Sequence, residues 1–202
     1  MTAINPARLK IQSAEVADYF QEPSRFVSEL HDLMVFYSAR IRQTSLERTP
    51  LSLQAYQVPA PVIRAIEIEI KEYLDDYPSQ GFNLVDRLWA EEWVEFRQLA
   101  AILLGNIPPD DPQTVLHRIH SWLGSCTSEE IRKIILERGI KRMISEKPDL
   151  VIDYISDLAA DPAKENRQAA LYGLELFVQK SDYDNLPLIF KILEGILQIE
   201  ET

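Results

Sequence analysis

The hydrophobic positions of this chain recur at three- and four-residue steps, which is the spacing of amphipathic α-helices. We expect the first long helix from Pro23 to about Leu46, because its large apolar side chains form one stripe (Phe26, Leu30, Leu33, Met34, Tyr37 and Ile41). A lead-in with a short helix at 14–20 precedes it. No stretch alternates between apolar and polar residues as a half-buried strand does, so the sequence predicts an all-α protein.

A three-residue phrase, Glu-x-Arg, recurs with a period of 35 residues: Glu95-Phe96-Arg97, Glu130-Ile131-Arg132 and Glu165-Asn166-Arg167. Each phrase opens an apolar helical run, and a loop and a second apolar run follow it. A fixed period in the thirties with two helices per period is typical of helical repeat proteins. The sequence therefore predicts an α-solenoid of antiparallel helix pairs.

This period predicts one solenoid domain over residues 1–202. Its expected parts are a lead-in and capping helix at 1–58, a weak first repeat at 59–91, and helix-pair repeats at 92–126, 127–160 and 161–202. The first repeat is weak because Arg64 lies 33 residues before Arg97 and Val62 stands where the later copies carry Glu.

Capping residues mark several of the expected helix starts. Asp111 and Asp161 are each followed by proline, which fits an N-cap with proline in the first helical position. Thr127 and Glu130 fit a capping box, in which two side chains satisfy two backbone N–H groups reciprocally. The second copy is expected to run on as one helix past Ile140.

The repeated arginines allow two interpretations. Residues two apart do not face each other on a helix, so the Glu and Arg of one phrase must find other partners. Each Arg can bridge to the Glu of a neighbouring repeat and stabilise the stack. Alternatively, the arginines form a row on the concave face, where guanidinium groups bind phosphates or carboxylates in bidentate fashion.

Composition limits the possible functions. The 202 residues carry a net charge of −11 with a pI near 4.8, which disfavours nucleic-acid binding on average but does not exclude a local basic groove. A single cysteine, Cys126, excludes a disulfide framework. The chain shows no secretory signal and no apolar run long enough to span a membrane, so we expect a cytoplasmic protein. Nothing indicates a cofactor or metal site, and His117 and His120 are expected at the surface.

Three stretches resemble the HEAT-like DNA alkylation repair glycosylases. They are Leu88-Trp89 with Glu95-Phe96-Arg97-Gln98-Leu99-Ala100, Val58-Pro59-Ala60-Pro61-Val62-Ile63-Arg64, and Asn166-Arg167-Gln168-Ala169-Ala170. The resemblance extends over about residues 25–200. It implies a single-domain, right-handed α-solenoid of HEAT-like antiparallel helix pairs that holds duplex DNA in a concave basic groove and removes N3- and N7-alkylated purines.

The resemblance also implies site residues. Arg167 matches the family's DNA-contacting arginine. The family's Trp-Asp-x-x-Asp stretch falls at Ser125-Cys126-Thr127-Ser128-Glu129, so Glu129 stands where the second acid is found, and the tryptophan and first aspartate are not preserved. Lys164-Glu165-Asn166 replaces the aromatic residue that usually precedes the arginine. Glu129 is therefore the candidate catalytic carboxylate, although an acidic residue at a helix start also has a plain capping role.

The remaining candidate DNA contacts are Arg64, Arg97, Arg132, Trp122 and Lys164, with Trp122 alternatively a core residue. Two hypotheses follow. The first is a divergent relative of the glycosylases that binds double-stranded DNA, with weak or lost base excision. The second is a non-enzymatic acidic repeat scaffold that binds a protein partner.

Overall fold

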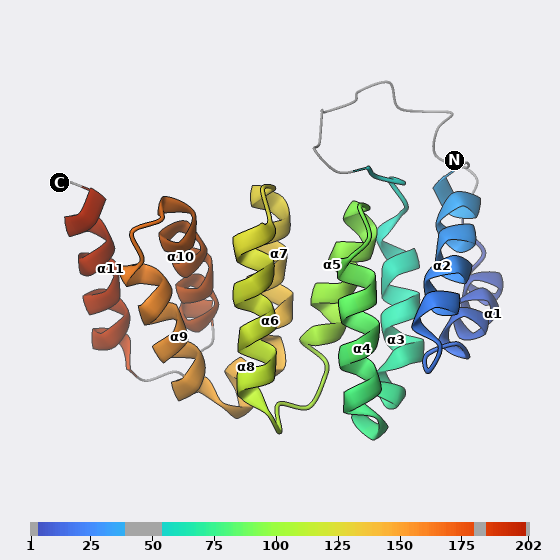
Figure 1. The fold of residues 1–202 in the computed structure, drawn as a ribbon, viewed down its shortest axis with the longest axis horizontal. Helices are drawn as coiled ribbons and strands as arrows, with labels where there is room; N and C mark the ends of the chain where they lie inside the picture. The colour runs from blue at the N-terminus through green and yellow to red at the C-terminus, as the bar shows by residue number, and fades with distance from the viewer. Residues whose placement is uncertain (1–3, 39–53, 180–184, 201–202) are drawn as a thin grey trace. The chain divides into compact units, whose positions relative to one another are not determined.

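The computed structural model describes residues 4–38, 54–179 and 185–200 (Figure 1). The chain divides into two compact units, Met1–Pro108 and Pro109–Thr202. Unit 1 contains α1 (Pro6–Ala17), α2 (Pro23–Ser38), α3 (Ala60–Asp76), α4 (Pro78–Trp89) and α5 (Val94–Leu104). Unit 2 contains α6 (Pro112–Ser125), α7 (Glu129–Gly139), α8 (Lys141–Glu146), α9 (Pro148–Ala160), α10 (Lys164–Gln179) and α11 (Leu186–Glu200).

Within unit 1, helices pack against the neighbour after next as well as the next one. Helix α3 contacts both α1 and α5, while α2 contacts α4 (Figure 1). The stripe predicted for α2 is buried, with Phe26, Leu30 and Met34 fully enclosed. Burying each such side chain contributes roughly 1.5–3 kcal/mol, so this shared core holds the helices of unit 1 together.

Unit 2 shows the same type of packing. Helix α7 lies against α10, and α9 lies against both α10 and α11 (Figure 1). The α9–α10 crossing is close because Gly173 has no side chain there. A Cβ on Gly173 would lie 2.7 Å from Cδ1 of Ile155, nearer than real Cβ atoms approach their neighbours. This crossing fixes α10, which carries Arg167.

The all-α prediction is confirmed for the part of the chain that the structure describes. That part contains no strand, and its one β-type feature is an isolated parallel bridge between Gln54 and Trp93. None of the described helices has both the length and the apolar character needed to cross a membrane. The helices fall within the expected repeat ranges, whereas the division into five parts stays a prediction.

Several predicted helix boundaries were wrong. Helix α1 begins at Pro6 rather than Ala14, because Asn5 accepts hydrogen bonds from the backbone of Ala7 and Arg8. The second copy does not continue past Ile140 as one helix, since α7 ends at Gly139 and α8 follows. The predicted end of the first long helix, 39–46, lies outside the described residues.

The predicted caps were right in one case and wrong in two. Asp111 caps α6, with its carboxylate accepting from the backbone N–H of Thr114. Ser128 rather than Thr127 caps α7, because its hydroxyl is the group that reaches the backbone N–H of Ile131. Asp161 caps a turn through the backbone N–H of Ala163, and α10 starts only at Lys164.

Candidate nucleic-acid interface

The three repeated arginines share one contact. Each donates a hydrogen bond to the backbone carbonyl of the residue six positions before it, in the segment that leads into its own helix. These bonds are Arg97 Nε to Glu91 O (3.1 Å), Arg132 Nε to Cys126 O (2.9 Å) and Arg167 Nη1 to Asp161 O (3.1 Å). A carbonyl outside the helix has no intrahelical partner, so each bond satisfies an otherwise orphaned acceptor. The three arginines therefore share one role, which is to hold the segment that leads into the helix carrying each of them.

Burial differs among these arginines. Arg167 is 8% exposed, and its Nη1 also donates to the carbonyl of Pro162 at 2.7 Å. Arg132 is half-buried, and its Nη1 has no hydrogen-bond partner among the described residues. Arg64 is exposed on α3. Two of the four arginines belong to each unit, and their alignment along one face stays a prediction.

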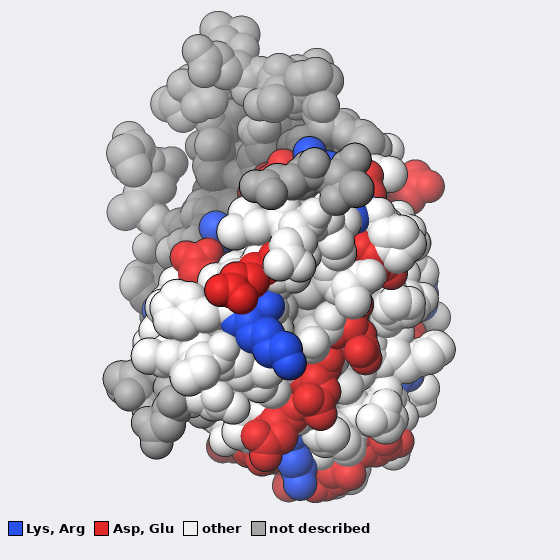
Figure 2. All heavy atoms as spheres, turned by 90° about the vertical axis from the view of Figure 1, so that its left-hand side faces the viewer, with Lys and Arg blue, Asp and Glu red and all other residues white. Residues whose placement is uncertain are grey.

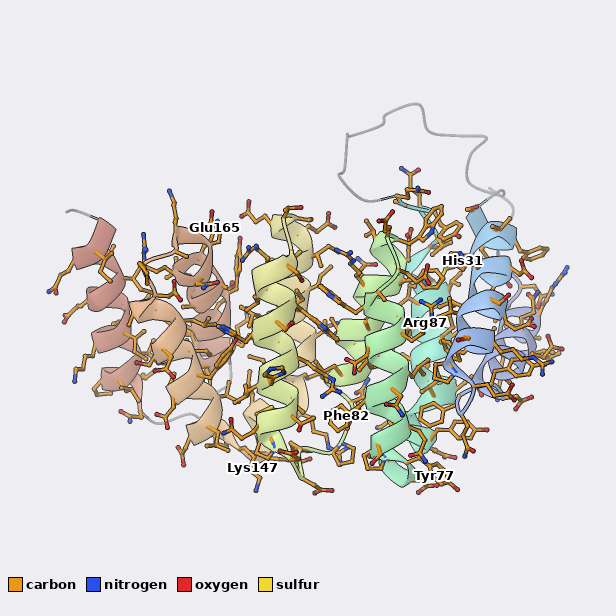
Figure 3. The ribbon with its side chains drawn as sticks, viewed as in Figure 1. His31, Tyr77, Phe82, Arg87, Lys147 and Glu165 are labelled. Atoms are coloured by element: carbon orange, nitrogen blue, oxygen red, sulfur yellow. The ribbon has the colours of Figure 1, made fainter. Side chains whose placement is uncertain are left out.

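The glutamates of the phrase have different surroundings. Glu130 and Glu165 are exposed, and Figure 3 shows Glu165 at one end of the unit 2 helices, opposite Lys147. Glu95, in contrast, is 5% exposed. Its two carboxylate oxygens accept from the backbone N–H groups of Tyr56 (3.1 Å) and Gln57 (2.6 Å). Glu95 therefore fixes the segment that precedes α3, where Gln57 has a φ of 59°.

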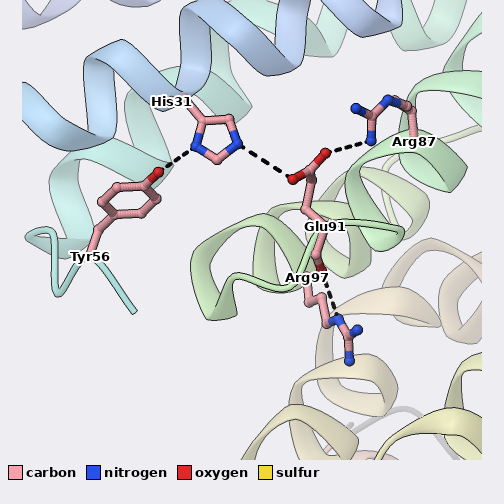
Figure 4. Close-up of polar contacts among 5 residues, drawn as sticks. All are labelled: His31, Tyr56, Arg87, Glu91 and Arg97. Carbon is pink, nitrogen blue, oxygen red and sulfur yellow. Dashed lines mark hydrogen bonds and ion pairs between the residues drawn. The ribbon is translucent and has the colours of Figure 1, made fainter. Parts of the chain in front are cut away.

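A polar network centred on Glu91 joins α2, α4 and the segment that precedes α3. His31 of α2 and Arg87 of α4 both reach Glu91 (Figure 4). The His31 Nε2 lies 3.4 Å from Glu91 Oε2, and Arg87 Nη1 lies 2.5 Å from Glu91 Oε1. The Tyr56 hydroxyl forms a hydrogen bond with His31 Nδ1. Because Nε2 faces a carboxylate, it carries the proton in the neutral ring, and Nδ1 accepts from Tyr56.

Aromatic rings enclose this network. Tyr56 stacks on Trp93 with ring centroids 3.8 Å apart, and the His31 ring lies 4.4 Å from that of Phe96. His31 is thus a packing residue that also joins α2 to the loop before α3. Burial, together with the nearby carboxylates of Glu95 and Glu91, raises the pKa of Tyr56 to about 12.

Alkaline pH should therefore destabilise the folded protein through Tyr56. An unfolded tyrosine loses its proton near pH 10, whereas folded Tyr56 keeps it to about pH 12. The contribution is fully present below pH 10 and is lost as pH rises to 12. We expect Tyr56→Phe to reduce the fall in unfolding free energy over this interval in urea titrations. Tyr77→Phe, at an exposed position, should leave it as in the wild type.

Glu129, the candidate carboxylate, is held by two residues of α10. It is exposed in the first turn of α7, and its Oε1 accepts from Gln168 Nε2 at 3.0 Å and from the Tyr172 hydroxyl at 2.6 Å. The hydrogen bond to this carboxylate raises the pKa of Tyr172. Lys133, one turn further along α7, lies with its Nζ 5.6 Å from the centroid of the Tyr172 ring.

This arrangement gives an accessible carboxylate with a fixed position. Gln168 directly follows Arg167 on α10, so one of the two partners of Glu129 is the chain neighbour of Arg167. The two contacts to Glu129 were not predicted. Gln168 belongs to the Asn166-Arg167-Gln168 stretch that carries the resemblance, but nothing in the sequence marked Tyr172.

The other candidate residues differ in accessibility. Lys164 is exposed at the start of α10. Trp122 is 4% exposed, as expected of a core residue. Cys126, four residues further along the chain, is also buried. His117 and His120 are exposed, and no group of three or more His, Cys, Asp or Glu within the described ranges could hold a metal ion.

Comparison with known families shows which family the chain belongs to. Residues 49–202 match the family described as DNA alkylation repair enzyme. This range starts before α3 and includes Glu129, Arg167 and all of unit 2. No curated protein and no solved structure matches the chain significantly. The family match extends over most of the chain and agrees with the resemblance carried by its repeated phrases, so the chain belongs to the DNA alkylation repair enzyme family.

Proposed function

We propose that this protein binds alkylated duplex DNA and acts on it as a divergent, weak N-glycosylase, with Glu129 as the catalytic carboxylate. The observation that carries the proposal is the fixed position of Glu129, whose Oε1 accepts hydrogen bonds from Gln168 and Tyr172 of α10. Membership of a DNA-repair family supports the choice of DNA as the partner.

The expected chemistry needs only one carboxylate. An N3- or N7-alkylated purine is cationic, so the bond from its nitrogen to C1′ of the sugar can break with the electron pair leaving on the base. The sugar then has oxocarbenium character, and a nearby carboxylate stabilises that positive charge. Water adds to C1′ and loses its proton. Glu129 is exposed, so a duplex can reach it without opening the core.

Basic side chains of unit 2 would contact the phosphates. Lys164 is exposed at the start of α10, whereas Arg132 is half-buried and its unpaired Nη1 is buried, so Arg132 would have to rearrange before that donor could reach a phosphate. Arg167 has its Nη1 engaged by loop carbonyls, so its proposed role is to fix the start of α10 beside the lesion. In unit 1 we propose contacts from Arg64 and Arg97.

We also propose that the helix pairs form a right-handed HEAT-like solenoid. The support is the packing of α3 between α1 and α5, of α7 against α10, and of α9 against α11. Stacked helix pairs place equivalent helices side by side in this way. A concave face of such a stack would hold the duplex.

One assay tests the proposed function. Release of 7-methylguanine from methylated duplex DNA should exceed the spontaneous rate, and DNA affinity should fall linearly with the logarithm of salt concentration. Binding without release would show that excision has been lost. If the protein shows no DNA binding and no base release, the proposal is contradicted. That result would favour the alternative function, a non-enzymatic acidic scaffold that binds a protein. The burial of Arg167 and Trp122 is the observation that favours this alternative.

A further inference from the structure

Helix α11 of unit 2 carries two apolar stripes. The inner stripe packs into unit 2 and consists of the buried isoleucines at positions 189, 192 and 196. The outer stripe consists of Leu186, Phe190 and Leu197, which are 46%, 62% and 63% exposed, together with the half-buried Leu193. A helix that is apolar on two sides is normally covered on both. The outer stripe therefore lacks the cover that its composition indicates.

The outer stripe is separate from the groove between α9 and α11. The α11 residues that line this groove include Leu188, Gly195 and Ile199. At 3.6 residues per turn, these three lie about half a turn around the helix from the centre of the outer stripe. A partner that covers the outer stripe therefore contacts the side of α11 that faces away from the groove.

The spacing within the outer stripe is that of a coiled-coil seam. Its four residues follow one another at steps of four, three and four, as the a and d positions of a heptad do. The order of the steps is the same when the stripe is read from its other end. A second copy of α11 that runs antiparallel can therefore match it. Such a pair places Leu186 opposite Leu197 of the second copy, and Phe190 opposite its Leu193.

We propose that the outer stripe joins two copies of this chain through an antiparallel pair of α11 helices. The two-fold axis passes midway between positions 190 and 193, so each apolar layer occurs twice, as in other interfaces that use the same patch on both subunits. The stripe spans 11 positions, or about 16 Å. This seam is short, since stable dimers usually bury about 800 Å² per partner. The dimer should therefore be reversible.

The acidic character of the chain is compatible with this pairing. The outer stripe holds no charged side chain. Helix α11 forms one end of unit 2, and Figure 2 faces that end and shows acidic side chains in a band with uncharged surface on both sides. Charges further apart than about 8 Å are largely screened at physiological salt. The net charge of −11 should therefore oppose association mainly at low salt, and added salt should strengthen the dimer.

This proposal is independent of the proposed DNA-repair function. Glu129 lies on α7, and Gln168 and Tyr172 lie on α10, so none of them belongs to the outer stripe. Loss of dimerisation and loss of base release can therefore be measured separately.

Sedimentation equilibrium of the full chain tests the dimer. We expect a monomer–dimer equilibrium with a dissociation constant of about 100 μM or tighter. Phe190→Glu should raise this constant at least about tenfold, because it places a charge in the central layers of the seam. The matched control is Ile199→Glu, which adds the same charge to the opposite side of α11 at a residue that is 42% exposed, and it should dimerise as the wild type does. Circular dichroism melting checks that both variants are folded.

Cysteine variants test the antiparallel register. A mixture of Leu186→Cys and Leu197→Cys chains should form disulfide-linked dimers when oxidised with copper phenanthroline. Either variant alone should not, because the antiparallel pair keeps two like positions at least about 16 Å apart, well beyond the reach of a disulfide. The native Cys126 is buried, so the wild-type chain is the control for background cross-linking.

Three results would overturn the proposal. The first is a wild-type chain that stays monomeric up to about 1 mM. The second is a dimer that Phe190→Glu leaves intact. The third is cross-linking of Leu186→Cys alone as efficient as that of the mixture, which would show a parallel or unspecific contact.

Discussion

Glu95→Ala is expected to lower the free energy of unfolding by about 2–6 kcal/mol. The substitution removes both acceptors of the Tyr56 and Gln57 backbone N–H groups. A buried donor left without an acceptor costs about 1–3 kcal/mol, and here two are lost together. Because native proteins are stable by only about 5–15 kcal/mol, the loss should be visible as a large shift of the urea midpoint.

The repeat supplies two matched controls for this prediction. Glu130 and Glu165 hold the same place in their own phrases but are exposed. Their alanine variants should change the unfolding free energy by no more than about 0.5 kcal/mol. Glu95→Gln should fall between the extremes, since one amide oxygen still accepts while the NH₂ group faces a donor. Equal effects at all three positions would refute the structural role assigned to Glu95.

The contrast among these glutamates explains what the sequence could not predict. The three phrases are alike in sequence, but only Glu95 has a loop segment packed over it, which comes from 38 and 39 residues earlier. That segment precedes the first copy of the phrase, and Glu130 and Glu165 are exposed. Periodicity reveals what repeats share, so it could not reveal a contact that one repeat makes alone.

The arginines show the opposite case. Their shared bond to the carbonyl six residues earlier is local, and the repeat predicted that they share a role. The bonds observed here go to backbone carbonyls, a partner that the arguments from charge did not consider, whereas contacts of the arginines with phosphates stay a prediction. A guanidinium is also a good donor to carbonyls at a helix entrance, where the backbone cannot satisfy itself.

The contacts of Glu129 are partly readable from the period. Glu129 and Lys164 are 35 residues apart, so the predicted period makes α7 and α10 equivalent helices that should lie side by side, and the two helices do pack against each other. Gln168 is one turn beyond Lys164 and Tyr172 is two turns beyond it, on the same face. The period thus predicts which helix faces Glu129, whereas the choice of partner depends on side-chain packing.

Glu129→Gln should reduce release of 7-methylguanine from methylated duplex DNA by about 100-fold or more. The amide oxygen can still accept from Gln168 and Tyr172, so the position of the side chain is retained while its negative charge is lost. A carboxylate that stabilises positive charge on the sugar acts only through that charge, so DNA affinity should change far less than the release rate.

Glu130→Gln is the matched control, because it removes the same charge one residue along in the first turn of α7 and is also exposed. It should retain the wild-type release rate within about twofold. Tyr172→Phe should give an intermediate loss, since it frees the carboxylate without neutralising it. Equal release rates for Glu129→Gln and Glu130→Gln would contradict the catalytic role of Glu129. Glu129 would then be an acidic residue whose charge interacts favourably with the N-terminal end of the α7 dipole, and another group would perform any excision.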